Sequence, residues 1–439
     1  MRSRLLHARE SFWFLPTLFG VLAIGLAFGL IEVDRLLLRA GIQDLPLVED
    51  LSATGGRAIL SAIGGTMLGV AATSFSITIS VLATTSSAYG PRLVRNFMAD
   101  RGNQVVLAVL TSTFLYSLIV LRSVHTEEDA TLAFVPVVAV GFAVLLAVGD
   151  VAVLVYFIHH IALSVQVTTL QKRVLGELED VIGELSGEGE RERDAREEPF
   201  PSGGVVLAAP RAGYIEQLEL ERLVALGARH DAVLRMLAQP GDHVLAGDPV
   251  LEVSGGSDGA GDGAGDLAEA ALAAVVIADA RTPHQDLRYA VQQVVEIGVR
   301  GLATGTNDPY TAVSALDALT GALVEFCNGD GPRTRLRDSD GVARLFCTWP
   351  SAADLLAEVY LALRAYALDQ PLVVRAGIRL AQRLEPVAHG AARAELHRQL
   401  AAFAAAYDAA DRDLLETPVV RRDLQELLER LSTRERLQS

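Results

Sequence analysis

The sequence has almost no lysine, few cysteines and few aromatic residues. Among its 439 residues, Lys172 is the single lysine, Cys327 and Cys347 are the two cysteines, and aromatic residues make up 6%. With a formal net charge of −16, such a chain lacks the clustered cations that nucleic-acid binding requires, so we expect no nucleic-acid partner. Two widely separated cysteines form neither a disulfide framework nor a metal-ligand motif. We interpret them as buried thiols in a reducing compartment.

Common enzyme motifs are also missing. The sequence contains no P-loop, no H-E-x-x-H and no cluster of histidine and cysteine. An enzyme site would be indicated only if one pocket held Arg281, His284 and Asp286 together. The simpler interpretation of these residues is a capped helix start after Pro283. We therefore expect no enzymatic activity, no metal and no cofactor.

Long apolar segments occur in the first third of the chain, although the whole chain is acidic. The mean hydropathy is +0.32 and 51% of the residues are hydrophobic. A helix needs about 20 mainly apolar residues to cross a lipid bilayer. Four segments meet this requirement, and together they predict a transmembrane domain over residues 1–170. These segments are residues 12–31, 58–83, 104–121 and 132–158.

Basic residues set the expected orientation of these helices. Arg2, Arg4 and Arg9 precede the first segment, three further arginines stand between the second and third, and Lys172 and Arg173 follow the fourth. Loops on the cytoplasmic side of membranes are enriched in lysine and arginine. We therefore expect a multi-pass protein of the inner or plasma membrane, with both termini and the C-terminal domain in the cytoplasm.

The second segment carries hydroxylated and small residues at steps of three and four, which places them on one helix face. Glycine pairs spaced G-x-x-x-G allow close approach of helices. Two interpretations stay open: tight packing within one bundle, or a stripe that several copies of the chain turn toward a water-filled axis. The pore-lining candidates are Thr66, Thr73, Ser76, Ser80, Thr84 and Ser87. The helix-packing candidates are Gly25, Gly29, Gly65 and Gly69.

Asp150 lies inside the fourth apolar segment, where an ionisable group is expensive and is a functional candidate. Counted from the expected helix ends at ~1.5 Å per residue, its level matches Ser76 on the second helix and Thr111, Ser112 and Thr113 on the third. A polar layer across three helices is therefore predicted. Two roles stay open for Asp150: a protonated or hydrogen-bonded group that locks the bundle, or an ion or proton site.

The composition changes after the fourth segment. Residues 171–202 indicate a charged helical stalk or linker, and residues 203–253 a small β domain. Residues 254–266 form a Gly/Asp-rich linker without the spacing of a calcium loop. Residues 267–439 indicate an α-helical cytoplasmic domain with one hairpin around Asp340-Gly341. The expected fold is thus mainly α, with a four-helix transmembrane unit, a small β insert and a helical domain.

Two short strings in this region have clear local patterns. Residues 240–253 resemble half of a biotinyl- or lipoyl-type barrel-sandwich domain, but no lysine is present to carry a cofactor, so a structural barrel is predicted. In the second string, Gly305 suits a helix end, Asp308 a helix cap and Pro309 the first position of the next helix. We predict a structural turn there. A functional role for Asn307 and Asp308 is the alternative.

Three strings of residues resemble one known family. They are residues 74–82 with 87–92, residues 240–253 and residues 305–312. On these residues the whole chain resembles the bacterial predicted-membrane-protein family catalogued as domain of unknown function 2254. The resemblance implies an order of membrane helices, small β insert and helical domain, and it implies no particular activity.

The leading functional hypothesis is a homo-oligomeric membrane channel or pore for small ions, with the C-terminal domain as gate or vestibule. Four helices are too few to enclose a path alone, so conduction requires several copies around one axis. The alternative is a membrane-anchored scaffold or sensor that binds a cytoplasmic partner, which would be favoured if the stripe were buried within its own bundle. A proton-coupled carrier that uses Asp150 ranks third.

Overall fold

The computed structural model is mostly helical and divides into two compact units, Met1–Thr169 and Leu170–Ser439. The expected fold class is confirmed, with four apolar helices, a small mixed-sheet region and a helical C-terminal region. The structure describes residues 13–40, 52–89, 101–125, 134–164, 167–185, 200–201, 203–255, 262–303, 305–329, 331–410 and 416–438.

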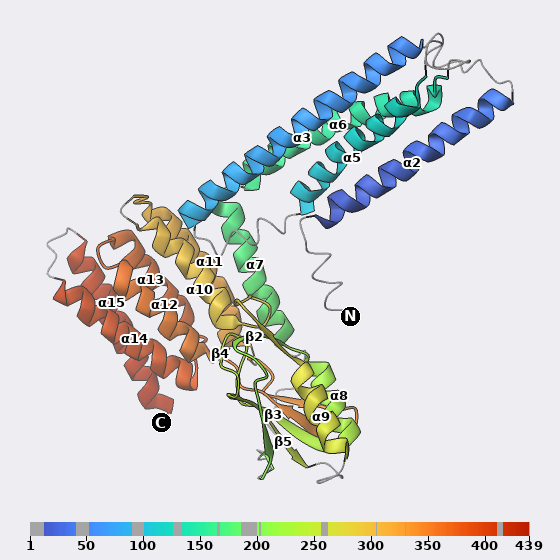
Figure 1. The fold of residues 1–439 in the computed structure, drawn as a ribbon. Coiled ribbons are helices and arrows are strands. Elements are labelled where there is room, and N and C mark those ends of the chain that lie inside the picture. Colours follow the sequence, from blue (N-terminus) through green and yellow to red (C-terminus); the bar gives the residue numbers. More distant parts are fainter. Residues whose placement is uncertain are drawn as a thin grey trace. The chain divides into compact units, whose positions relative to one another are not determined.

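Four long helices make up the first unit (Figure 1). All four are long and apolar enough to cross a membrane, so four helices capable of spanning it are present where four spans were predicted. Each helix is longer than expected, or displaced by a few residues, because its backbone continues past the apolar run. These helices are α2 (Phe14–Arg39), α3 (Ala53–Tyr89), α5 (Arg101–Ser123) and α6 (Val137–Ser164).

Helix α5 is the central helix of this bundle. Half of its apolar window is buried, compared with 22% for α2, α3 and α6, which pack around it. The interior contains two apolar clusters. The first apolar cluster is Ala23, Ala27, Ile31, Leu60, Tyr116, Val120, Val124, Ala139, Val140 and Ala143. The second apolar cluster is Ala71, Val106, Leu110, Phe157 and Ile161.

A carboxylate on α2 caps the start of α6. The Asp34 Oδ1 atom accepts a hydrogen bond from the Val138 backbone N–H at 2.9 Å, and Oδ2 accepts one from Ala139 at 3.0 Å. The first N–H groups of a helix have no partner within it and carry a partial positive charge, so a carboxylate satisfies both needs. This contact explains why α2 continues past Glu32 and Asp34, where the apolar run ends.

Removing this cap is expected to weaken the bundle. Asp34→Ala leaves two N–H groups of α6 without an acceptor and should cost about 1–2 kcal/mol. The melting temperature of the purified protein in detergent checks this, and Asp34→Asn should retain part of the stability. Glu32→Ala is the matched control on the same helix, because its ion pair with Arg35 is half exposed and worth little. An equal effect of both alanine variants would contradict the capping role.

The second unit begins with most of helix α7 (Val167–Leu185). Val174 and Leu178 are fully buried. The Gln171 Nε2 donates a hydrogen bond to the Thr311 carbonyl at 3.2 Å and its Oε1 accepts one from Ser314 at 3.0 Å. The predicted stalk therefore does more than connect two regions: from Gln171 to Leu185, apolar residues at steps of three and four give it a buried face.

Two small sheets follow. In the five-stranded sheet, all neighbours are antiparallel except β3 and β8, which run parallel with Leu234 opposite Leu345. The expected hairpin at Asp340-Gly341 is present as β7 and β8. The order of the first sheet is β1 (Val205–Ala208), β5 (Pro249–Gly255), β3 (Ala232–Met236), β8 (Ala343–Phe346) and β7 (Arg335–Arg337). The second is β4 (His243–Val244), β2 (Gly213–Leu218) and β6 (Val275–Ala278).

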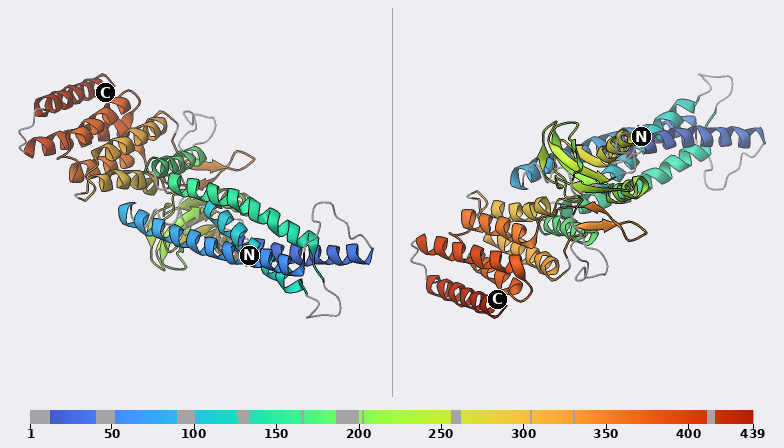
Figure 2. Two further views of the ribbon diagram at one scale, coloured as in Figure 1. Left: turned by 90° about the horizontal axis from the view of Figure 1, so that it is seen from above. Right: turned by 90° about the horizontal axis from the view of Figure 1, so that it is seen from below.

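Helices make up the rest of the second unit, and α14 and α15 lie side by side (Figure 2). The expectation that residues 267–439 are helical apart from one hairpin is wrong at β6, because the β-branched run Val275-Val276-Ile277 pairs with β2. The helices are α8 (Leu220–His230), α9 (Asp262–Ala273), α10 (Leu287–Gly301), α11 (Pro309–Asn328), α12 (Ala352–Tyr366), α13 (Pro371–Leu384), α14 (Gly390–Ala409) and α15 (Thr417–Gln438).

The turn between α10 and α11 has the geometry of a helix cap. Asp308 accepts hydrogen bonds from the Tyr310 and Thr311 N–H groups and, at 2.6 Å, from the Thr311 hydroxyl, which lowers the pKa of the Asp308 carboxyl. Pro309 occupies the first turn of α11, and Asn307 has a left-handed backbone with φ of 44°. Helix α10 ends at Gly301, so Gly305 lies within the turn that follows.

Both cysteines are free thiols in this structure. Burial raises the pKa of Cys327 to about 11 and that of Cys347 to about 12. Each thiol therefore stays protonated near neutral pH and is a poor nucleophile.

Candidate functional site

Three buried polar side chains lie between the two apolar clusters of the membrane bundle. Asp150 on α6 is 2% exposed, and Thr113 and Ser117 on α5 are 0% exposed. On α5, Thr113 and Ser117 lie between Leu110, which belongs to the second apolar cluster, and Val120, which belongs to the first. We call Thr113, Ser117 and Asp150 the central polar layer.

The central polar layer is short of hydrogen bonds. The Thr113 hydroxyl is the neighbour that faces the Asp150 carboxyl. Among the residues that the structure describes, neither of these groups, nor the Ser117 hydroxyl, has a partner that meets full hydrogen-bond geometry. Buried polar groups usually have such partners, and a carboxyl inside a membrane helix is costly without one. This layer is therefore the strongest candidate for a site in the bundle.

The other hydroxyls predicted for this layer are used within their own helix. Thr111 Oγ1 donates to the Leu107 carbonyl at 2.6 Å, and Ser112 Oγ donates to the Val109 carbonyl at 2.7 Å. Both side chains are only partly buried. Thr113 is thus the member of the predicted trio that lies beside Asp150.

Ser76 lies at a different level, so its place in the predicted layer is wrong. A β-carbon on Gly64 would lie 3.6 Å from the Ser117 β-carbon, which aligns α3 with α5 at that point. Ser76 stands 12 residues beyond Gly64, or about 18 Å along α3, whereas Thr113 stands four residues from Ser117, or about 6 Å along α5. The prediction failed because it took the ends of the helices to lie at one common level, whereas the contact of Gly64 with Ser117 sets α3 against α5 independently of where the helices end.

A second polar level was missed by sequence reasoning. Ser74, Thr78 and Asn103 are all at most 3% exposed, and the amide atoms of Asn103 have no hydrogen-bond partner among the described residues. Thr78 stands 14 residues after Gly64 and Asn103 stands 14 residues before Ser117, so the two share a level on the antiparallel helices α3 and α5. For Ser74 and Thr78, polarity inside an apolar segment was the available signal, whereas Asn103 stands just before one.

The hydroxyl stripe of α3 faces away from its own bundle. Ser76 lies between the buried residues Ser74 and Thr78, and at 100° per residue it points about 160° away from each of them. The side chain of Ser87 lies outside the described residues. The described hydroxyl members of the stripe are all exposed: Thr66, Thr73, Ser76, Ser80 and Thr84.

The four glycines expected to pack helices together do not do so inside the bundle. No described atom lies within 4 Å of a β-carbon built on Gly25, Gly29, Gly65 or Gly69. For Gly65 and Gly69 the reason is that they belong to the exposed stripe. Close approach instead uses other glycines: a β-carbon on Gly20 would lie 3.0 Å from Leu115, and Gly64 meets Ser117.

The charged group that would have indicated an enzyme in the second unit is structural. Asp286 is 2% exposed, forms a two-pronged ion pair with Arg281 at 2.7 and 2.9 Å, and caps α10 through the Tyr289 N–H. His284 is exposed and takes no part in these contacts. In the described parts of the chain, no group of three or more His, Cys, Asp or Glu side chains could hold a metal ion.

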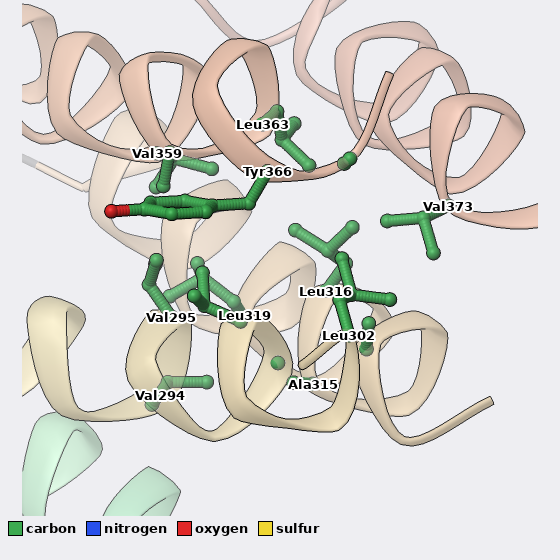
Figure 3. A pocket seen from close by; sticks show the side chains of 15 residues that line it. Val294, Val295, Leu302, Ala315, Leu316, Leu319, Val359, Leu363, Tyr366 and Val373 are labelled. Atoms are coloured by element: carbon green, nitrogen blue, oxygen red, sulfur yellow. The ribbon is translucent and has the colours of Figure 1, made fainter. Parts of the chain in front are cut away.

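A small apolar groove lies among α10, α11, α12 and α13 (Figure 3). Val295, Leu319 and Leu363 line it, and the exposed ring of Tyr366 lies across it. Apart from the Tyr366 hydroxyl, its lining side chains carry no polar group. The groove therefore offers apolar contact but no chemistry.

Comparisons with known proteins agree with a membrane protein. Uncharacterized protein Mb1321c of Mycobacterium bovis is 31% identical over 376 residues, which cover 85% of this chain and 71% of that protein. Uncharacterized protein Rv1290c of Mycobacterium tuberculosis has the same identity and coverage. No solved structure matches the chain. The family described as predicted membrane protein (DUF2254) matches residues 9–383. The chain therefore belongs to the DUF2254 family of predicted membrane proteins.

Proposed function

We propose that the protein is a homo-oligomeric membrane channel for small ions, in which the exposed hydroxyl stripe of α3 lines a path shared by several copies. The observation that carries this proposal is the direction of the stripe, on the face of α3 opposite to its buried face. Had the stripe been buried within its own bundle, a scaffold would have been the better interpretation.

The physical argument concerns what covers the stripe. A row of hydroxyls gains little from contact with lipid tails, since each serine or threonine there can bond only to its own helix. Thr73 and Thr84 do so, to the Gly69 and Ser80 carbonyls at 2.9 Å. Water, or the same stripe of another copy, would provide further partners. The glycines Gly65 and Gly69 on this face leave room for either.

The remaining features of the proposal follow from charge. The chain carries a net charge of −16, mostly outside the apolar helices, and this field favours cations at the mouth of a pore. In the proposed orientation both termini and the second unit are cytoplasmic, on the basis of the arginine distribution. The second unit then gates the path or forms its vestibule.

Planar-bilayer recording of the purified protein tests the proposal, with steps first in voltage and then in membrane tension. We expect discrete openings whose unitary conductance changes with Ser76→Val, because the substitution replaces a pore hydroxyl by two methyl groups. Phe75→Leu is the matched control: it changes an exposed side chain of the same helix about 100° away from Ser76.

Two results would contradict the proposal. Silence of folded, inserted protein under both stimuli would remove the channel and favour a membrane-anchored scaffold that binds a cytoplasmic partner. Openings that Ser76→Val and Phe75→Leu leave equally unchanged would show that the path runs elsewhere.

A further inference from the structure

The strongest unassigned feature is the Asp150 carboxyl itself. It is nearly fully buried on α6, and among the described residues both of its oxygen atoms lack a hydrogen-bond partner of full geometry. The second apolar cluster lies on one side of it and the first on the other. An ion without a counter-charge in such surroundings costs several kcal/mol. The packing seen here therefore suits the uncharged carboxyl.

No charged group of the described helices compensates Asp150. Among the described residues, the side chain that acts on it is that of Thr113, through its hydroxyl. Asp34 is occupied at the start of α6, and Tyr116 donates its hydroxyl hydrogen to the Ala139 carbonyl at 2.9 Å, eleven residues before Asp150. The titratable and charged side chains described on the four helices are Glu32, Asp34, Arg35 and Arg39 on α2, Arg57 on α3, Arg101, Tyr116 and Arg122 on α5, and Asp150, Tyr156, His159 and His160 on α6.

We propose that Asp150 is a reversible proton-binding site in the centre of each bundle, with Thr113 as its hydrogen-bond partner in both states. In the proton-bound state the carboxyl O–H donates to the Thr113 oxygen. When the proton leaves to water, the Thr113 O–H turns and donates to the carboxylate. One hydroxyl thus serves both states, because it can both donate and accept.

The chemistry of the layer fits a proton better than a metal ion. A bound sodium or calcium ion takes several oxygen ligands, six to eight for calcium. The central polar layer offers the carboxyl and the hydroxyls of Thr113 and Ser117, between apolar side chains. A proton needs one oxygen and removes the charge that the surroundings cannot stabilise.

Release of the proton has a structural consequence. The charged carboxylate requires water or a displaced helix, so α6 must loosen from α5 or admit water between the apolar clusters. The second polar level, with Thr78 and Asn103, lies beyond the second apolar cluster, toward the end of the bundle where α3 finishes. The site lies on the buried side of α3, opposite the hydroxyl stripe, and is thus separate from the proposed pore lining.

Infrared difference spectroscopy of the full-length protein in liposomes tests this inference. Spectra of the wild type and of Asp150→Asn are recorded from about pH 4 to about pH 10, a range that includes and exceeds ordinary carboxyl titration. Subtracting the two series removes the many surface carboxylates. We expect one carbonyl band of a protonated carboxyl in the remainder, which disappears as the pH rises.

A remainder without any pH-dependent band would overturn the inference and make Asp150 a permanent structural lock. Thr113→Val is the second variant, for the case that Asp150→Asn does not fold. It keeps the carboxyl and removes the hydroxyl, so the band should persist with a shifted frequency and a shifted midpoint pH. A spectrum identical to the wild type would remove Thr113 as the partner and overturn the proposal. Because these spectra need no conduction, their outcome is independent of the proposed channel.

Discussion

Asp286→Ala is expected to destabilise the second unit strongly, by about 3–5 kcal/mol. The reason is that Asp286 is nearly fully buried and supports two elements at once, the Arg281 guanidinium and the start of α10. Removing the carboxylate leaves Arg281 half-buried without its counter-charge and the Tyr289 N–H without its cap. Water reaches both groups poorly and cannot fully replace the hydrogen bonds that they lose.

The melting temperature of the full-length protein in detergent measures this effect. For a unit of this size, the expected loss corresponds to a decrease of roughly 6–20 °C. Asp317→Ala is the matched control: its pair with Arg379 is about half exposed on both sides and should contribute less than about 1 kcal/mol. If both variants have the same melting temperature as the wild type, the Arg281–Asp286 pair does not stabilise the unit.

Gly241→Ala is expected to have a comparable effect through the same carboxylate. A β-carbon at Gly241 would lie 2.2 Å from the Asp286 Oδ2 atom, and the backbone φ of 95° is one that other residues adopt with strain. Overpacking and backbone strain together should cost about 2–5 kcal/mol. Thermal unfolding again measures the loss.

Gly247 provides a control that separates the two causes. Its φ of 97° is nearly the same, but no described atom lies within 4 Å of an added β-carbon. Gly247→Ala should therefore cost only the backbone strain of about 1–2 kcal/mol. In an Asp286→Ala background, Gly241→Ala should fall to this same value, since the clash is gone. Equal losses at both glycines in the wild-type background would show that the clash is relieved at no cost.

The existence of the four membrane helices could be read from the sequence, because runs of about 20 apolar residues leave few alternatives. Their ends could not. Helix α2 continues over Glu32 and Asp34 because the Asp34 carboxylate meets the N–H groups of α6, a contact between residues more than a hundred positions apart. The charges of Glu32 and Asp34 suggested that the helix ends there, whereas the contact with α6 stabilises its continuation.

The hydroxyl stripe illustrates a second limit of sequence reasoning. A period of three to four residues shows that Thr73, Ser76 and Ser80 share a face, but it does not show whether that face points into the bundle or out of it. That direction depends on the other helices. Helix α5 packs at Gly64, on the face of α3 opposite to the stripe. The proximity of Asp150 and Thr113 was easier to predict, because both lie deep in apolar segments, where buried polar side chains tend to lie near one another.

The sheets show the third limit. The hairpin of β7 and β8 could be predicted, since its turn and both strands are local. Its parallel pairing with β3 could not, because Leu234 and Leu345 are brought together only by the fold. Likewise β6 lies in a region that was expected to be helical, although its β-branched residues were a usable signal.

The pairing of β3 with β8 also has a consequence for synthesis of the chain. As the protein leaves the ribosome, β3 is complete at Met236, but β8, which pairs with one of its edges, begins only at Ala343. That edge of β3 therefore stays unpaired while the segments between them, including α9, β6, α10 and α11, are synthesised. An open strand edge is a template for pairing with other chains. Nascent chains that stall before Ala343 are therefore the species in which chaperone binding or aggregation should concentrate.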